Sequence, residues 1–256
     1  MRIASWNVNS VRARVANITS WLETARPDVL LLQEIKCEDD AFPRLELEAM
    51  GYKCAVAGQK SYNGVALLSK EPATDIKVGL DGDADDTQAR YIEATVGGVR
   101  IASLYLPNGN PVGTEKYSYK LAWMARLHQH VQKLLKQESP FVLGGDFNVI
   151  PEEVDVYDPK GWENDALFLP QTREAYRSLL NLGLTEAFRA LHPDQKEAYS
   201  FWDYQAGAWP RNLGLRIDLF LLSPQAADRL SACAIDAAPR GQDKASDHTP
   251  VIVTLD

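Results

Sequence analysis

The sequence predicts a layered α/β fold, because short apolar strands recur along the whole chain and amphipathic helices lie between them. Seven runs have the length and β-branched content of strands. The run Val29–Leu32 and the Leu219–Leu222 part of another run are continuously apolar, which is typical of strands covered on both faces. The seven runs are Ile3–Val8, Val29–Leu32, Val65–Leu68, Val99–Leu106, Phe141–Leu143, Ile217–Leu222 and Val251–Leu255.

Apolar residues at helical spacing predict three helices, each with one face that packs against a sheet. The third helix is expected to end near Gly183, since glycine adopts the left-handed conformation that closes many helices. The apolar positions are Val11, Val15, Ile18 and Leu22 in the first helix, Leu121, Met124, Leu127, Val131, Leu134 and Leu135 in the second, and Tyr176, Leu179 and Leu180 in the third.

Length and composition are typical of one folded domain. The chain has 256 residues, of which 45% are hydrophobic and 24% charged, close to the averages of globular proteins. No repeat, low-complexity tract or flexible linker divides it, so a single domain spanning residues 1–256 is predicted. No apolar run reaches the ~20 residues of a membrane helix, and the first residues lack a signal-peptide core. We therefore expect a cytoplasmic protein without membrane association.

The net charge of −8 argues against a protein that coats nucleic acid non-specifically, because that mode of binding neutralises many phosphates. It leaves room for a nucleic-acid enzyme, since a group of carboxylates that holds a cation is negative by design. The three cysteines, Cys37, Cys54 and Cys233, are widely separated, so neither a metal motif nor a closed disulfide framework is expected.

Polar residues stand at the ends of the predicted strands, where a rigid sheet presents side chains at a common edge. Together they offer oxygen ligands for a hard cation, a group that orients water, amide donors for a phosphate, and a histidine beside carboxylates. His128 and His130 lie inside the long helix and are interpreted as structural. The polar segments are Ser5-Trp6-Asn7, Leu32-Gln33-Glu34, Tyr105-Leu106-Pro107-Asn108-Gly109, Gly145-Asp146-Phe147-Asn148, Arg216-Ile217-Asp218 and Ser246-Asp247-His248.

These segments, in this order and from one end of the chain to the other, resemble the exonuclease III family of apurinic/apyrimidinic (AP) endonucleases, within the endonuclease/exonuclease/phosphatase superfamily. The resemblance implies a four-layered α/β sandwich, in which two mixed β-sheets pack face to face with helices on the outside, as in DNase I. It also implies a metal-dependent phosphodiester hydrolase. Periodicity alone predicts the layers but not this topology.

The resemblance also implies roles for the polar residues. Mg²⁺, with Mn²⁺ as a substitute, is the expected cofactor, because hard divalent ions prefer oxygen ligands. Some family members carry an acidic residue where this chain has Asn9, so one metal carboxylate is absent here. The implied metal ligands are Asn7, Glu34, Asp146, Asn148 and Asp247, and the implied catalytic residues are Tyr105, Asp146, Asn148, Asp218 and His248.

A segment rich in aromatic residues, running from Phe201 to Asp218, matches the abasic-site recognition loop of this family. A small apolar pocket suits a deoxyribose that lacks its base. Trp209, beside a proline in a polar loop, is expected to be exposed and to wedge into a groove. Arg216 is expected in a basic rim. The substrate-binding candidates are Asn108, Phe201, Trp209, Leu215 and Arg216.

The expected function is hydrolysis of the DNA backbone 5′ to abasic sites, with 3′→5′ exonuclease and 3′-end trimming activity beside it. The partner is double-stranded DNA with abasic sites or damaged 3′ ends, and no obligate protein partner is evident. One alternative is a phosphodiesterase of the same fold that acts on RNA, a lipid or an inositol phosphate. Another is a catalytically weak DNA-binding member. Neither the balance of activities nor the number of metal ions follows from the sequence.

Overall fold

Two six-stranded sheets, packed face to face, form the centre of the computed structural model, which describes residues 1–256. Both sheets are mixed, because β1 runs parallel to β2 and β7 runs parallel to β8, whereas the other neighbours are antiparallel. The first sheet has the order β11 (Leu230–Ile235), β12 (Val251–Leu255), β1 (Arg2–Asn7), β2 (Val29–Gln33), β4 (Val65–Ser69), β3 (Lys53–Ala57), and the second has the order β5 (Thr74–Val78), β6 (Tyr91–Val96), β7 (Val99–Tyr105), β8 (Phe141–Asp146), β10 (Asp218–Leu222), β9 (Thr185–Glu186).

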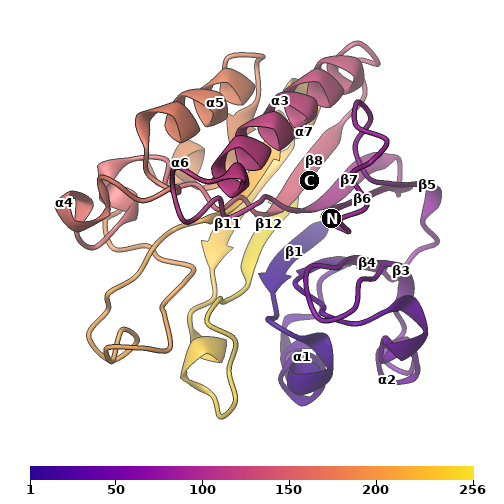
Figure 1. Cartoon of the computed structure of the whole chain (residues 1–256). Coiled ribbons are helices and arrows are strands. Elements are labelled where there is room, and N and C mark those ends of the chain that lie inside the picture. Colours follow the sequence, from indigo (N-terminus) through magenta and orange to yellow (C-terminus); the bar gives the residue numbers. More distant parts are fainter.

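Helices cover the outer faces of the two sheets (Figure 1). The amphipathic helix α1 packs on the first sheet through residues such as Ile18 and Leu22, and α3 packs on the second through Leu127 and Val131. The helices are α1 (Val11–Ala25), α2 (Arg44–Glu48), α3 (Glu115–Leu135), α4 (Pro159–Trp162), α5 (Pro170–Leu180), α6 (Ala187–Leu191) and α7 (Pro224–Ala227). The predicted four-layered sandwich is therefore confirmed.

All seven predicted strands and all three predicted helices are present, but the sequence pattern misses five strands: β3, β5, β6, β9 and β11. In β6 the reason is Glu93, a charged residue in the middle of the strand that is nevertheless only 2% exposed. None of the helices combines the length and apolar character that a bilayer-spanning segment needs. That residues 1–256 form one domain stays a prediction.

The strand directions bring the polar strand ends to one edge of the sandwich. The carboxyl ends of the parallel strands β1 and β2 lie side by side, as do those of β7 and β8, where Tyr105 is opposite Asp146. Because β10 runs antiparallel to β8, its first residue, Asp218, is also opposite Asp146. Strand β12 is antiparallel to β1, so the segment that precedes it carries His248 to the same edge. This edge is the candidate site.

Candidate active site

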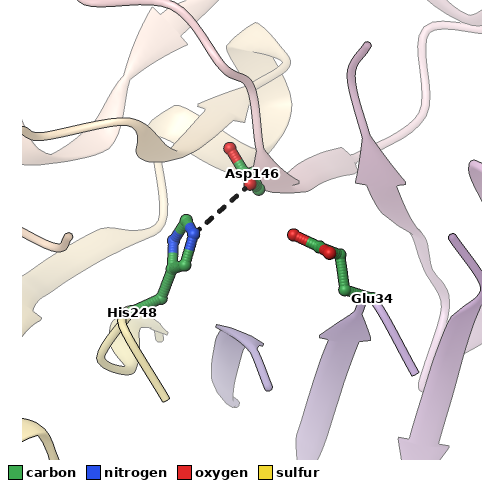
Figure 2. A group of neighbouring side chains, drawn as sticks. All are labelled: Glu34, Asp146 and His248. Atoms are coloured by element: carbon green, nitrogen blue, oxygen red, sulfur yellow. Dashed lines mark ion pairs between the residues drawn. The ribbon is translucent and has the colours of Figure 1, made fainter. Parts of the chain in front are cut away.

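Glu34, Asp146 and His248 form the centre of the site. One oxygen or nitrogen atom from each lies within 4.8 Å of those of the other two. Figure 2 shows the three side chains converging from separate segments of the chain, with His248 Nε2 3.7 Å from Asp146 Oδ2. This is the only group of acidic, histidine or cysteine side chains in the structure arranged closely enough to hold a metal ion.

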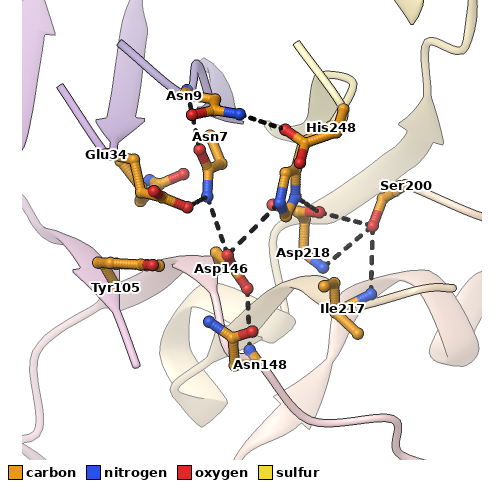
Figure 3. A network of polar contacts seen from close by, with 12 residues as sticks. Asn7, Asn9, Glu34, Tyr105, Asp146, Asn148, Ser200, Ile217, Asp218 and His248 are labelled. Carbon is orange, nitrogen blue, oxygen red and sulfur yellow. Dashed lines mark hydrogen bonds and ion pairs between the residues drawn. The ribbon is translucent and has the colours of Figure 1, made fainter. Parts of the chain in front are cut away.

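Asn7 joins the two carboxylates, and it does so across the two sheets (Figure 3). Its side-chain amide donates to Glu34 Oε1 at 2.8 Å and to Asp146 Oδ2 at 2.9 Å, and its Oδ1 accepts from the backbone N–H of Asn9 at 3.0 Å. Asn7 ends β1 in the first sheet and Asp146 ends β8 in the second. A single buried amide therefore fixes the spacing of the carboxylates.

Glu34 is held by a lysine that follows it closely in the chain. Lys36 Nζ lies 2.9 Å from Glu34 Oε2 and also donates to the side-chain oxygen of Asn9. Burial alone raises the pKa of Glu34, but the charge of Lys36 and the hydrogen bond from Asn7 outweigh it, so that the pKa is lowered. The carboxylate is therefore ionised at neutral pH.

Asn9 links this group to Asp247, the further predicted metal ligand. The Asn9 amide donates to Asp247 Oδ1 at 3.1 Å. Asp247 lies outside the central group of three, and its Oδ1 also accepts from the hydroxyl of Ser246 at 3.3 Å. An amide at position 9 therefore bridges Lys36 and Asp247, where an acidic residue would add negative charge.

His248 is oriented by Asp218. Its Nδ1 lies 2.8 Å from Asp218 Oδ2, which also accepts from Ser200 Oγ at 2.7 Å. Burial alone lowers the pKa of His248, but the charges of Asp218 and Asp146 raise it to about 10. The imidazole is therefore protonated at neutral pH and presents a positive charge beside Asp146.

Asp146 is connected by hydrogen bonds to Asn148 and, through it, to Asn108, the two asparagines that the sequence analysis proposed as phosphate contacts. The backbone N–H of Asn148 donates to Asp146 Oδ1 at 2.9 Å, and the amide of Asn108 donates to Asn148 Oδ1 at 3.2 Å. Asn148 has a left-handed backbone with φ of 46°, which turns the chain directly after β8. Burial and the nearby carboxylates of Asp218 and Glu34 raise the pKa of Asp146, against the opposing charge of His248.

Tyr105 lies at the end of β7, opposite Asp146 in the neighbouring strand. Burial, followed by the charges of Glu34 and Asp146, raises the pKa of its hydroxyl well above the ordinary value. The guanidinium of Arg90 lies 4.7 Å from the centre of the ring. Tyr105 therefore stays protonated and remains a hydrogen-bond donor.

The aromatic segment borders this polar group. The Phe201 ring lies 4.9 Å from the His248 ring in an edge-to-face arrangement, and Phe201 exchanges backbone hydrogen bonds with Leu215. Leu215 is only 1% exposed and belongs to the apolar cluster against which Phe201 packs. Trp209 is half-buried rather than fully exposed, since its ring packs edge-on against Trp202 at 4.8 Å.

The expectation that Arg216 belongs to an exposed basic rim is wrong. Arg216 is 1% exposed, and its Nε and Nη2 donate to the two carboxylate oxygens of Asp155 at 2.8 and 3.2 Å. Its Nη1 lies 3.1 Å from Glu186 Oε2. The guanidinium is thus buried in the protein interior, where the carboxylates of Asp155 and Glu186 compensate its charge.

Two polar residues that the motifs did not single out also belong to the site, Lys36 and Ser200, and Asn9, noted in the sequence for its missing carboxylate, acts as a bridge. Ser200 donates to Asp218 and accepts from the backbone N–H groups of Ile217 and Asp218 at 3.2 and 3.1 Å. A serine inside an apolar segment carries no signal of its own in the sequence. Only the approach of the segment to β10 reveals this contact.

The family model for endonucleases, exonucleases and phosphatases matches residues 4–248, a range that contains every residue of this site. The chain belongs to the endonuclease/exonuclease/phosphatase family. Exodeoxyribonuclease III from Haemophilus influenzae is 35% identical over 262 residues, with 98% of each chain covered. Among solved structures, an AP endonuclease from Archaeoglobus fulgidus is 38% identical with a TM-score of 0.96, over 100% of this chain and 99% of that one.

The 3′ phosphatase NExo from Neisseria, solved with a product DNA hairpin, is 39% identical to this chain, with a TM-score of 0.97 over 100% of this chain and 99% of that one. Similarity at this level over the full length places the chain in the exonuclease III/AP endonuclease branch of the family. It is an enzyme of that branch, a phosphodiesterase and DNA nuclease.

Proposed function

We propose that the protein is a magnesium-dependent DNA-repair phosphodiesterase that cuts the backbone of double-stranded DNA 5′ to abasic sites. We propose in addition that it trims damaged 3′ ends. The observation that carries the proposal is the contact between a catalytic group and an apolar wall, the Phe201 ring 4.9 Å from His248. A small apolar surface beside the scissile phosphate suits a sugar that has lost its base.

The donor set fits a hard divalent cation. Glu34 and Asp146 offer carboxylate oxygens, the preferred ligands of Mg²⁺, and the imidazole of His248 is already engaged with Asp218. We propose Glu34 as the main ligand, with Mn²⁺ as an acceptable substitute. Asn7, Asp146, Asn148 and Asp247 are the further proposed ligands. When bound, the cation supplies positive charge that stabilises the negative charge of the reacting phosphate.

The side chains of the chain itself supply a base for the attacking water and two groups that stabilise the phosphate. Asp146, whose pKa burial raises, is the proposed base that orients and deprotonates the attacking water. His248, protonated and fixed by Asp218, faces the phosphate and stabilises its additional negative charge. Tyr105 keeps its proton and donates to a phosphate or leaving oxygen.

Recognition rests on the neighbouring asparagines and on the aromatic segment. The exposed Asn108 and its hydrogen-bonded partner Asn148 are proposed to contact the phosphate. Phe201, supported by Leu215, is proposed as the pocket wall. Trp209, braced against Trp202, is proposed to stack on bases beside the lesion.

The relatives differ in the activity for which they are named, one as an AP endonuclease and one as a 3′ phosphatase. The test is therefore a panel of duplexes with one abasic analogue, a recessed 3′ hydroxyl or a 3′ phosphate, assayed with Mg²⁺, with Mn²⁺ and with EDTA. We expect incision 5′ to the abasic analogue to be the fastest reaction, and EDTA to abolish it. Equal rates on the abasic duplex and on the undamaged duplex with a recessed 3′ hydroxyl would contradict the abasic-site assignment.

Single-stranded RNA and a phospholipid headgroup complete the panel, because a phosphodiesterase of the same fold could act on either. Preferred cleavage of one of these would replace DNA as the substrate. DNA binding without cleavage under all metal conditions would instead favour the catalytically weak alternative.

A further inference from the structure

A buried lysine lies beneath the two asparagine segments of the site. Lys120, in α3, is 0% exposed. Its ammonium group donates to the backbone carbonyl oxygen of Asn148 at 2.5 Å and to that of Asn108 at 3.0 Å. Both hydrogen-bond acceptors are therefore peptide carbonyls rather than carboxylates, and both belong to residues proposed to contact the phosphate.

Stability alone gives no reason for a cation at this position. Removing an ammonium group from water is costly, and apolar side chains of similar volume often replace buried charges without loss of stability. The cost is visible in the position of Lys120, whose side chain is 0% exposed and whose ammonium group hydrogen-bonds to two carbonyl oxygens and to no carboxylate. The two hydrogen bonds to carbonyl oxygens are the contacts that offset this cost, so the role of Lys120 is sought in them.

The loop after β7 is shaped around the lysine side chain. Gly109 has a left-handed φ of 90°, and a Cβ built on it would lie 2.6 Å from Lys120 Cδ. Any other residue at position 109 would displace either the loop or the lysine. The Asn108-Gly109 pair therefore supplies one exposed amide and the space for the side chain that holds this amide in place.

The contacts continue from the lysine to the reacting groups. Lys120 binds the backbone carbonyl oxygen of Asn148. The backbone N–H of the same residue donates to Asp146 Oδ1 at 2.9 Å. The side chains of Asn108 and Asn148 are joined at 3.2 Å. A shift of either carbonyl would thus move both amides and the carboxylate.

We propose that Lys120 is a positioning residue, whose ammonium group fixes the Asn108 and Asn148 peptides so that their amides and Asp146 are aligned on the scissile phosphate. This inference rests on the proposed nuclease mechanism but not on the choice of DNA lesion. Lys120 itself is too deeply buried to touch the substrate. Its effect should therefore appear in the rate of the chemical step.

The first experiment compares Lys120→Met with Met124→Ala. Methionine keeps most of the side-chain length but has no ammonium group, whereas Met124 packs in the apolar cluster on the same helix. We expect Lys120→Met to lower kcat about 10- to 100-fold, as small misplacements of catalytic groups do. Met124→Ala should lower the melting temperature with little change in kcat. A wild-type kcat in Lys120→Met, or an equal loss in Met124→Ala at matched stability, would overturn the proposal.

Gly109→Ala provides a second route to the same contact, should Lys120→Met fold poorly. The added methyl group displaces either the lysine side chain or the loop that carries Asn108, and it leaves the charge of the lysine in place. We expect a loss of kcat similar to that of Lys120→Met. An unchanged kcat in a folded Gly109→Ala variant counts against the proposed role.

A double-mutant cycle with Asn148→Ala separates positioning from a general loss of stability. If Lys120 acts through Asn148, adding Lys120→Met to Asn148→Ala should lower kcat by no more than about threefold further. Losses that multiply would show that the two residues act independently. The cycle is run on the DNA substrate that the wild type cleaves fastest, so that a failure of the abasic-site proposal is seen separately in the substrate panel.

Discussion

Two buried carboxylate–histidine pairs in this protein look alike but differ in the charges around them. One pair, Asp218 with His248 at 2.8 Å, lies in the active site, and the other, Glu93 with His130 at 2.9 Å, lies between β6 and α3. An aromatic ring also packs edge-on against each imidazole, from Phe201 at 4.9 Å and from Tyr91 at 5.5 Å. Geometry within the pair therefore does not distinguish His248, the histidine proposed to be catalytic, from His130.

The two pairs differ in how completely the carboxylate is hydrogen-bonded. Both oxygens of Glu93 are used, one by Arg100 at 2.8 Å and the other by Tyr91 at 2.7 Å and His130. In the active site, Asp218 Oδ1 is buried without a hydrogen-bond partner.

The charge balance differs as well. The negative charge of Glu93 is matched by Arg100. In the active site, by contrast, His248 faces Asp146 in addition to Asp218. A carboxylate–histidine pair with balanced charge stabilises the fold, whereas the additional carboxylates beside His248 remain available to bind a cation or to accept a proton.

The largest loss of activity is expected from a change at Asp146, the additional carboxylate beside His248. Asp146→Asn is nearly isosteric but cannot accept a proton, so we expect kcat on abasic duplex to fall about 10³-fold while DNA binding is retained. Single-turnover cleavage and fluorescence anisotropy measure the two effects. A rate near that of the wild type would show that another group activates the water.

The second largest effect is expected at Glu34, the proposed main metal ligand. Glu34→Ala is expected to remove most activity without changing the fold, because Glu34 stands at a strand end rather than in the apolar core. Raising the Mg²⁺ concentration should restore part of the rate. A mutant with unchanged turnover and unchanged Mg²⁺ dependence would exclude Glu34 as a ligand.

Replacing the carboxylate of each pair by its amide gives the sharpest test of the comparison. Asp218→Asn should lower kcat about 10²-fold, because the imidazole loses its orienting and charge-stabilising partner. Glu93→Gln should leave kcat within twofold but lower the free energy of unfolding by about 3 kcal/mol, since it leaves Arg100 without its charged partner. Steady-state kinetics and urea unfolding of both variants decide. Equal kinetic losses would mean that the pairs do not differ in function.

Acid titration should reveal the structural pair. Burial raises the pKa of Glu93, but hydrogen bonds from His130 and Arg100 outweigh it and lower the pKa to about 2. A folded pKa below the ordinary value of about 4.3 stabilises the protein above that pH, and the stabilisation is lost as the pH falls towards 2. The stability difference between wild type and Glu93→Gln should therefore shrink between about pH 5 and pH 2 in urea unfolding. A constant difference would contradict this assignment.

The smallest effect is expected where only one hydrogen bond is lost. Tyr91→Phe removes the donor to Glu93 Oε2 but keeps the ring against His130. The free energy of unfolding should fall by about 1 kcal/mol, and cleavage of abasic duplex should not change. A measurable loss of kcat would mean that this distant pair is coupled to the active site.

The sequence by itself determined which residues end the strands. Glu34, Asp146, Asp218 and His248 follow or precede apolar runs, and their order along the chain was sufficient for the resemblance to the exonuclease III family. The same reasoning treated His130 as structural because it lies inside a helix, and in the structure its ring contacts Glu93 outside the group of Glu34, Asp146 and His248. Strand ends are readable because apolar periodicity is a local property of the chain.

Only the tertiary structure decided which charges compensate one another. Arg216 stands two residues before Asp218 in the sequence, yet it turns inward to Asp155, 61 positions away. Lys120 and Glu93 have apolar neighbours in the sequence; Lys120 gains both of its carbonyl partners, and Glu93 gains His130, only where α3 packs on the second sheet. The physical reason is that a buried charge is tolerated only where partners converge on it in space, and contacts between distant segments depend on strand register and helix packing rather than on local pattern.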